Sequence, residues 1–251
     1  QIAERLMEKG WKPTKKTDKG NIIINEEVLD KIKMEEARMF SRYFLLQKRT
    51  GLLKSWIKEC QEDGRVRGKV LTLRTVTGRM AHYSPNMAQV PAVYSPYGKE
   101  CRSLWTVTNP DTHVLVGTDA SSLELRCLAH YLDDRGYINV VVNGDIHTAN
   151  QRAAGLKTRD QAKTFIYAFL YGAGPVKLGQ IVGGGAAQGA NLTKRFLDNV
   201  PNLKTLRKNI QEAAQEGPIR GVDGRLLQIR NVHSSVNTLL QGAGAIICKE
   251  W

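Results

Sequence analysis

The sequence predicts a mixed α/β (α+β) fold, because helical and strand-like patterns both occur along it. Most segments carry the apolar spacing of helices, whereas residues 66–77 contain the alternation that is typical of a β-strand. Residues 114–119 form a short apolar run that ends in a carboxylate, and a helix-start pattern follows it. We interpret this last segment as a strand, a turn and a helix.

The first part of the chain is predicted to be mostly helical. Residues 1–60 carry helical spacing, which a Lys-rich turn with Pro, Gly and Asp interrupts at residues 12–20. A second helix is predicted from about residue 26 to residue 60. Residues 83–98 are rich in Pro, Asn, Ser and Gly, so we expect a surface loop beside a sheet.

Two capping-box patterns predict helix starts, because the two side chains of such a box each satisfy a free backbone N–H. The first pattern pairs Ser121 with Glu124, and the second pairs Thr158 with Gln161. The second pattern opens an uninterrupted segment over residues 158–171, which Gly and Pro residues then stop. We therefore predict a helix over that range.

Further helical spacing covers residues 186–216, after a glycine-rich turn. Residues 221–225 contain two glycines and an Asp between two short polar strands, which predicts a hairpin.

The chain is strongly basic, which favours a polyanionic partner. It has 37 Lys and Arg against 24 Asp and Glu, and a formal net charge of +13. Nucleic acid is the partner that this charge predicts. The alternative is that surplus lysine only keeps the protein soluble.

Cysteine usage and hydropathy predict a cytoplasmic protein. The four cysteines contain no C-x-x-C pair, so neither a zinc site nor a disulfide framework is predicted. The sequence contains no apolar stretch of about 18 residues, so no membrane partner is predicted. The chain starts without Met and ends in a helical pattern, so we expect both ends to be cut.

Two faces are predicted on the helix over residues 158–171. Turning about 100° per residue places five apolar side chains on one arc, namely those of Ala162, Phe165, Ile166, Phe169 and Leu170. A neighbouring stripe carries two cations and two phenols: Arg159, Lys163, Tyr167 and Tyr171. Such a stripe can hold a triphosphate, because Arg offers a bidentate fork and Lys a point charge. By spacing alone, an amphipathic surface helix is the simpler interpretation.

Candidate ligands precede this helix. Asp119 follows an apolar run, where a carboxylate commonly binds a hard divalent ion such as Mg²⁺. Glu124 is interpreted, from the residues alone, as the capping partner of Ser121. Asp145 and His147 are at least as well explained by a turn as by ligand contact.

Taken together, these segments resemble DNA polymerases of family A, and within it the replicative polymerases of short-tailed bacteriophages. Residues 117–130 resemble motif A, and residues 143–148 with 158–174 resemble motif B and its approach. Residues 77–82, 84–91 and 233–241 resemble DNA-contacting segments of that group, in the same order. The resemblance covers nearly the whole chain. Ser122 stands where close relatives often have Gly, a change that we expect to be tolerated.

The resemblance implies a role for each candidate residue. Asp119 would bind both catalytic Mg²⁺ ions. Arg159 and Lys163 would hold the incoming triphosphate with help from His147, and Lys163 would also act as general acid toward pyrophosphate. Tyr167 would stack near the sugar.

Two further roles follow from the same resemblance. Glu124, next to Tyr171, would exclude ribonucleotides by filling the space of the 2′-hydroxyl. The minor groove of primer-template DNA would be contacted by Arg79, His233, Asn237 and Gln241.

The implied architecture is a right-hand polymerase fold, with fingers and an incomplete palm that has an antiparallel sheet. Residues 1–60 would be a thumb remnant, and residues 61–135 a palm part with DNA-contacting loops and motif A. Residues 136–220 would form the fingers with the motif B helix, and residues 221–251 would return to the palm.

One family element is missing: the His-Asp-Glu of motif C, since the sequence contains no His-Asp pair. A two-metal site needs at least two carboxylates. We therefore expect a template-directed DNA polymerase that transfers dNTPs to a primer end, present here without its second catalytic carboxylate. The alternatives are a non-catalytic DNA-binding remnant or a split-polymerase subunit that a second chain completes. A single-subunit RNA polymerase is disfavoured, because Glu124 would exclude the 2′-hydroxyl.

Overall fold

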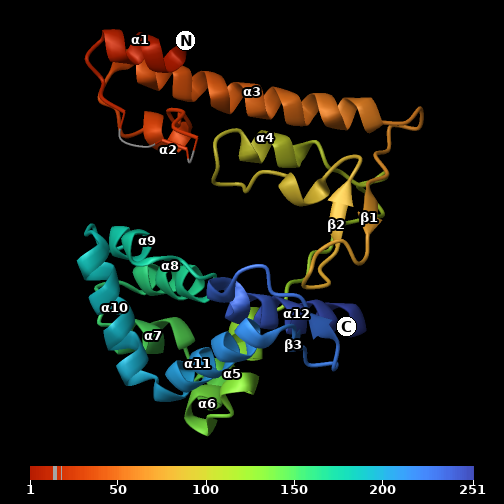
Figure 1. Cartoon of the computed structure of the whole chain (residues 1–251). Coiled ribbons are helices and arrows are strands. Elements are labelled where there is room, and N and C mark those ends of the chain that lie inside the picture. Colours follow the sequence, from red (N-terminus) through yellow and green to blue (C-terminus); the bar gives the residue numbers. More distant parts are fainter. Residues whose placement is uncertain (14–15, 18) are drawn as a thin grey trace. The chain divides into compact units, whose positions relative to one another are not determined.

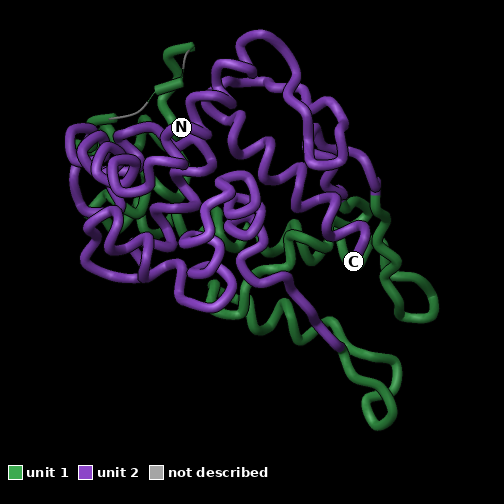
Figure 2. Tube along the Cα trace, turned by 90° about the horizontal axis from the view of Figure 1, so that it is seen from below, with its two compact units in different colours: residues 1–70, 82–115 green, residues 71–81, 116–251 purple. Residues whose placement is uncertain are grey.

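The structure, a computed structural model, describes residues 1–13, 16–17 and 19–251. It divides into two compact units, which Figure 2 shows in two colours. The first contains residues 1–70 and 82–115, and the second contains residues 71–81 and 116–251. Thr14, Lys15 and Asp18, which belong to the predicted Lys-rich turn, lie outside the described residues.

The first unit begins with a small helical cluster. Its helices are α1 (Ile2–Glu8), α2 (Glu26–Leu29) and the long α3 (Glu35–Glu59), which Figure 1 labels. Leu6 and Leu29 are fully buried in their shared core, together with Ala37. The single helix predicted from residue 26 to residue 60 is therefore wrong, because Ile32 and Met34 leave the helical path and pack against this core.

The rest of the first unit is mostly irregular. Strand β1 (Lys69–Leu71) pairs with β2 (Ala81–Tyr83), and η1 (Met87–Gln89) and α4 (Gly98–Ser103) follow. The strand predicted over residues 66–77 is thus reduced to three residues. The predicted loop over residues 83–98 is confirmed apart from its two ends and the one 3-10 turn, because Tyr83 ends β2 and Gly98 begins α4.

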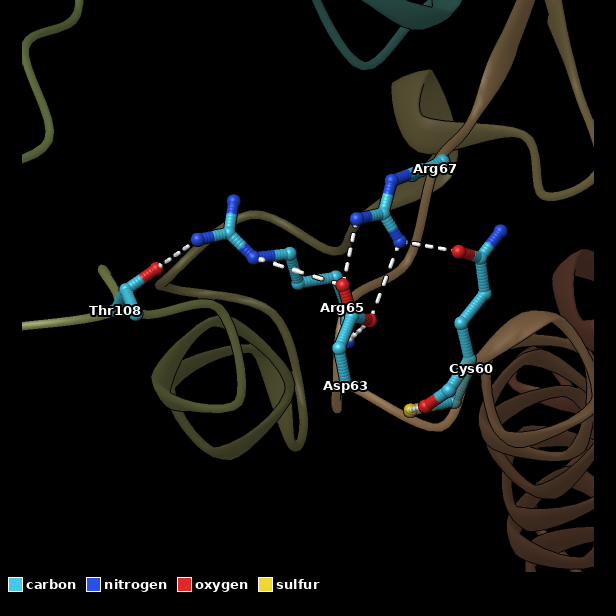
Figure 3. A network of polar contacts seen from close by, with 6 residues as sticks. Cys60, Asp63, Arg65, Arg67 and Thr108 are labelled. Carbon is cyan, nitrogen blue, oxygen red and sulfur yellow. Dashed lines mark hydrogen bonds and ion pairs between the residues drawn. The ribbon is translucent and has the colours of Figure 1, made fainter.

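A cavity of about 1020 Å³ opens in the first unit beside the end of α3. Trp56 and Trp105 line it, with ring centroids 5.0 Å apart and planes at 75°. The turn that follows α3 carries a polar network at the edge of this cavity (Figure 3): Arg67 donates to Asp63 at 2.6 Å, and Arg65 donates to Thr108 at 2.6 Å. Hydrogen bonding from Arg67 lowers the pKa of Asp63 to about 2.

The strand predicted over residues 114–119 is absent. Val114, Leu115 and Val116 are 79%, 71% and 81% exposed, and the segment is irregular. Within the part of the chain that the structure describes, the backbone of residues 114–119 forms no hydrogen bond. A strand requires a paired neighbour, so an apolar run without one stays irregular.

The second unit is a helical body. Its helices are α5 (Leu123–Leu132), α6 (Arg135–Asn143), α7 (Ile146–Ala154), α8 (Arg159–Leu170), α9 (Pro175–Gln180), α10 (Ala186–Asn199), α11 (Pro201–Glu216) and α12 (Ser235–Glu250). Between α11 and α12 lie a hairpin of β3 (Ile219–Arg220) and β4 (Leu226–Leu227) and the short η2 (Val232–Ser234). One core joins these helices, and Phe165, Phe169 and Phe196 meet in its centre with ring centroids 5.3 to 5.8 Å apart. The mixed α/β prediction is confirmed.

Helix α8 forms as predicted. Thr158 caps it through Gln161 N at 3.2 Å, and the Gln161 side chain accepts from Thr158 N, which completes the predicted capping box. The five residues of the predicted apolar arc are all buried. Gly172 stops the helix with a φ of +79°, a conformation that residues with a Cβ rarely adopt.

Helix α5 starts differently from its prediction. Its N-cap is Ser122, with a φ of 52° and no capping hydrogen bond from its side chain. The predicted capping box of Ser121 and Glu124 is therefore wrong. A left-handed Ser122 turns the chain at this point, and the Glu124 carboxylate is used elsewhere.

Two predictions toward the C-terminus are mostly confirmed. Residues 186–216 are helical but break at Val200, because Pro201 begins a new helix. The hairpin predicted at residues 221–225 connects β3 and β4, which are antiparallel with Ile219 opposite Leu227. Each described helix is too short or too polar to cross a membrane.

Candidate functional site

The predicted stripe on α8 lies on its outward side. Lys163 is exposed and, among the described residues, makes neither a hydrogen bond nor an ion pair. Tyr167 is half-buried, and Tyr171, the C-cap residue, is 46% exposed. Their ring centroids are 6.3 Å apart, so the two phenols continue the line that the cations begin.

Arg159, at the start of the stripe, is held by Asp145. Its Nε donates to Asp145 Oδ2 at 2.7 Å and its Nη2 donates to Oδ1 at 3.1 Å. Asp145 also caps α7, accepting from His147 N at 3.1 Å, so its turn-forming role is confirmed. The Arg159 guanidinium, followed by Thr148, holds the pKa of Asp145 far below its usual range. Arg159, which the sequence predicts as a phosphate-binding cation, is thus paired with a carboxylate in the structure.

His147 lies between α7 and the stripe. It is 7% exposed, and its ring centroid is 6.2 Å from that of Tyr167. Burial lowers the pKa of His147, and the charges of Arg159 and Lys163 lower it further, whereas Asp145 opposes them. The imidazole is therefore poised to be neutral beside two cations.

Glu124 connects α5 to two other elements. Its Oε1 accepts from Arg79 Nη2 at 2.7 Å and from the Tyr171 hydroxyl at 3.5 Å. The second contact is at the outer limit of a hydrogen bond. Burial raises the pKa of Tyr171, and the Glu124 charge adds to it. The family resemblance implied that Tyr171 lies next to Glu124, but no local pattern relates Arg79 to a residue 45 positions away.

Asp119 is exposed, and its carboxylate has no hydrogen-bond or ion-pair partner among the described residues. Its charge contributes to the raised pKa of Tyr167, after burial and Glu124, so it lies near the stripe. A free carboxylate suits a hard divalent cation. However, the described residues contain no group of three or more His, Cys, Asp or Glu that could hold one. Asp119 fits as one ligand of a metal site, but these residues do not complete the site.

The predicted DNA-contacting residues of the C-terminal segment are spaced by four. His233 is exposed in η2, and Asn237 and Gln241 are half-buried one and two turns into α12. Residues four apart share a helix face. A Cβ built on Gly172 would lie 2.6 Å from the His233 carbonyl oxygen, so the end of α8 meets the start of this row.

A family model described as DNA polymerase family A matches residues 1–251. The chain belongs to this family. It is 43% identical over 284 residues to the DNA-directed DNA polymerases of Enterobacteria phage T3 and Escherichia phage T7, with all of this chain covered. It is 33% identical over 296 residues to the DNA-directed DNA polymerase of Escherichia phage Phieco32, with 84% of this chain covered. The motif resemblance is thus confirmed.

This family A chain spans about 40% of the length of the T3 and T7 relatives. Its fold is that of the polymerase domain of Pol1 from M. smegmatis, solved in complex with DNA primer-template and dNTP. The TM-score is 0.77 at 21% identity, over 95% of this chain and 46% of that one. The polymerase fold is therefore established.

Two partnerships in this family A chain were missed by the sequence reasoning: Arg159 with Asp145, and Arg79 with Glu124. The first joins residues 14 apart and the second joins residues 45 apart. Neither spacing corresponds to a helix or hairpin rule, so only the folded backbone brings the partners together.

Proposed function

We propose that this chain is the nucleotide-selecting part of a template-directed DNA polymerase. The reaction is nucleotidyl transfer from a dNTP to a primer 3′-hydroxyl, with release of pyrophosphate. The observation that carries the proposal is the α8 stripe. There Lys163, which has no ion-pair partner among the described residues, and the forked Arg159 lie beside His147. By analogy with the phage relatives, the protein would act in the host cytoplasm.

The cationic half of the stripe would bind the triphosphate. Lys163 offers a point charge and a proton donor for the leaving pyrophosphate. Arg159 offers two parallel donors, but a phosphate would first have to replace Asp145 on them. We infer that Asp145 keeps Arg159 extended in the correct place until nucleotide arrives.

The phenol half of the stripe would bind the sugar. Tyr167 would pack against it, and the Glu124 carboxylate near Tyr171 would occupy the space that a 2′-hydroxyl requires. The pair supports a DNA polymerase over an RNA polymerase, because an RNA polymerase must admit that hydroxyl.

Primer-template DNA would be contacted by Arg79 and by the row of His233, Asn237 and Gln241. These side chains offer donors suited to the minor-groove acceptors that all correct base pairs share. The net charge of +13 supports a polyanionic partner. The family assignments of residue ranges also remain proposals: a thumb remnant, palm parts and fingers.

Asp119 would be one ligand of Mg²⁺, which in such enzymes activates the 3′-hydroxyl and neutralises the leaving group. The missing His-Asp-Glu segment would supply the second carboxylate, from the same polypeptide or from a complementing chain. A non-catalytic DNA-binding remnant is the second candidate, and the net charge of +13 is compatible with it, since DNA binding needs no catalytic metal.

Primer extension tests the proposal. The 251-residue chain with Mg²⁺ and four dNTPs should extend a primer at no more than trace rate. Adding a polypeptide that carries the family's His-Asp-Glu segment, fused or in trans, should restore extension, and Asp119→Ala should abolish it. Asp111→Ala, at another exposed acid, is the matched control. Robust extension by the chain alone, or failure of the fused protein, would contradict the proposal.

A further inference from the structure

Three polar atoms behind the α8 stripe are buried without a well-formed hydrogen bond to any described residue. They are His147 Nδ1, Asn150 Nδ2 and the Tyr137 hydroxyl oxygen. His147 is 7% exposed and Asn150 is 1% exposed. Buried polar groups are rarely left unpaired in native proteins, so a group of them requires an explanation.

The three atoms belong to one neighbourhood. His147 and Asn150 are three residues apart on α7, so they share a helix face. Burial raises the pKa of Tyr137, on α6, and hydrogen bonding from the Asn150 amide lowers it, so these two side chains are neighbours. Tyr137 also lies within electrostatic reach of Tyr167 on α8.

The donor and acceptor inventory of this cluster decides the proton position on His147. The Asn150 nitrogen can only donate, whereas the Tyr137 hydroxyl donates one hydrogen bond and also accepts. The Asn150 amide already acts as a donor toward the Tyr137 oxygen. A neutral imidazole has one nitrogen that donates and one that accepts. If Nδ1 carried the proton, it would compete with the Asn150 amide for the Tyr137 oxygen. With its lone pair, Nδ1 can accept from these groups, directly or through an enclosed water.

We propose that Tyr137 and Asn150 are positioning residues that hold His147 as the Nε2–H tautomer, so that Nε2 is the donor offered to a nucleotide phosphate. The phosphate part of this inference rests on the proposed function, whereas the tautomer does not. The charges of the residues that face His147 favour a neutral imidazole. Arg159 and Lys163 from α8 oppose a third positive charge, Asp145 favours it less strongly, and Tyr167 is uncharged.

The arrangement has a chemical advantage for binding. A neutral Nε2–H donates to a phosphate oxygen without adding charge repulsion against the two cations of the stripe. Fixing the tautomer in the free protein also removes the need to reorganise a buried proton when nucleotide binds.

Long-range ¹H–¹⁵N NMR spectra of the ¹⁵N-histidine-labelled chain test the tautomer, with His147 assigned through His147→Gln. At pH 7.5 we expect the Nε2–H form. Tyr137→Phe removes only the hydroxyl and should shift the population toward Nδ1–H. Asn150→Asp replaces a donor with an acceptor and should reverse the tautomer and raise the His147 pKa. Asn139→Asp, exposed on α6, is the matched control and should change neither.

An Nδ1–H form in the unmodified chain, or a tautomer unchanged in both variants, would overturn the inference. Calorimetric titration with dATP and Mg²⁺ tests the phosphate part separately. Tyr137→Phe should weaken dATP binding several-fold, and equal affinity would overturn its role in nucleotide binding. If the unmodified chain shows the Nε2–H form but binds no dATP, the proposed function fails and the tautomer inference stands.

Discussion

Arg79 donates to Glu124 across 2.7 Å, which ties a residue that we propose to contact DNA to one that we propose to contact the nucleotide sugar. Their side chains are 41% and 17% exposed, so solvent only partly screens the pair. Glu124 occupies Nη2 of Arg79 and fixes the orientation of the guanidinium, which leaves fewer of its five donors for a minor groove. The pair therefore couples the two proposed substrates.

Weakening this pair should strengthen DNA binding. In Glu124→Gln the charge-assisted bond is lost, so Arg79 is released at lower cost and the affinity for primer-template DNA should rise about two- to fivefold. Glu216→Gln removes the same charge at an exposed position on α11 and is the control. Fluorescence anisotropy at fixed salt measures both, and equal gains would mean that only net charge matters.

Sugar discrimination should depend on the same carboxylate. Glu124→Ala opens the space of the 2′-hydroxyl and leaves Tyr171 without its acceptor, so dNTP use should fall somewhat and discrimination much further. In a polymerase completed with the missing segment, the measurement is the ratio of kcat/KM for dCTP over CTP. If that ratio is unchanged, Glu124 has no part in sugar selection.

Removing the Lys163 charge from the stripe should strongly impair nucleotide incorporation. Lys163→Ala should lower kcat/KM of the completed polymerase by roughly 3 kcal/mol, or more than 100-fold, as lost transition-state charge stabilisation does. Lys177→Ala removes the same charge at an exposed position on α9 and should have little effect on kcat/KM. A loss under about tenfold would exclude Lys163 from the reacting phosphates.

The lowered pKa of His147 should make stability depend on pH. Its folded pKa is below the unfolded value of about 6.5, so the unfolded chain binds more protons as pH falls through that value. Stability from this residue is thus present above about pH 6.5 and is lost as pH falls toward the folded pKa. The free energy of unfolding, measured with urea at several pH values from 5 to 7.5, should change less with pH in His147→Gln than in the unmodified chain. An identical pH dependence in both proteins would contradict a lowered His147 pKa.

Replacing Ser122, whose backbone is left-handed, with glycine should stabilise the protein. Its φ of 52° costs a residue with a Cβ about 1 kcal/mol that glycine avoids. Ser122→Gly should therefore raise the free energy of unfolding by up to about 1 kcal/mol. Ser121→Gly, at a neighbour outside the left-handed region, should not. A lower Tm in Ser122→Gly would show that the Ser side chain stabilises the turn.

Local features were predictable from the sequence, and non-local ones were not. Helix α8 depends on a cap, an apolar arc and a glycine stop that all lie within fifteen residues of one another, so periodicity and capping rules located it. The motif segments likewise identified the family. The strand at residues 114–119 failed, because a strand needs a partner that periodicity does not supply.

The capping box at Ser121 failed for a related reason. The sequence has the Ser-x-x-Glu pattern of a capping box, but the backbone of Ser122 is left-handed and the Glu124 carboxylate accepts a hydrogen bond from the distant Arg79. Similarly, the stripe on α8 was predicted, whereas the engagement of Arg159 by Asp145 was not. Ion pairs between separate elements depend on the folded backbone, which no local spacing specifies.

Gly172 leaves no room for even a methyl group between the end of α8 and the carbonyl of His233. Main chain alone therefore sets the separation between the helix that carries the stripe and the segment that leads into α12. With no deformable side chain between the two backbones, a displacement of the C-terminal end of α8 would pass directly to His233.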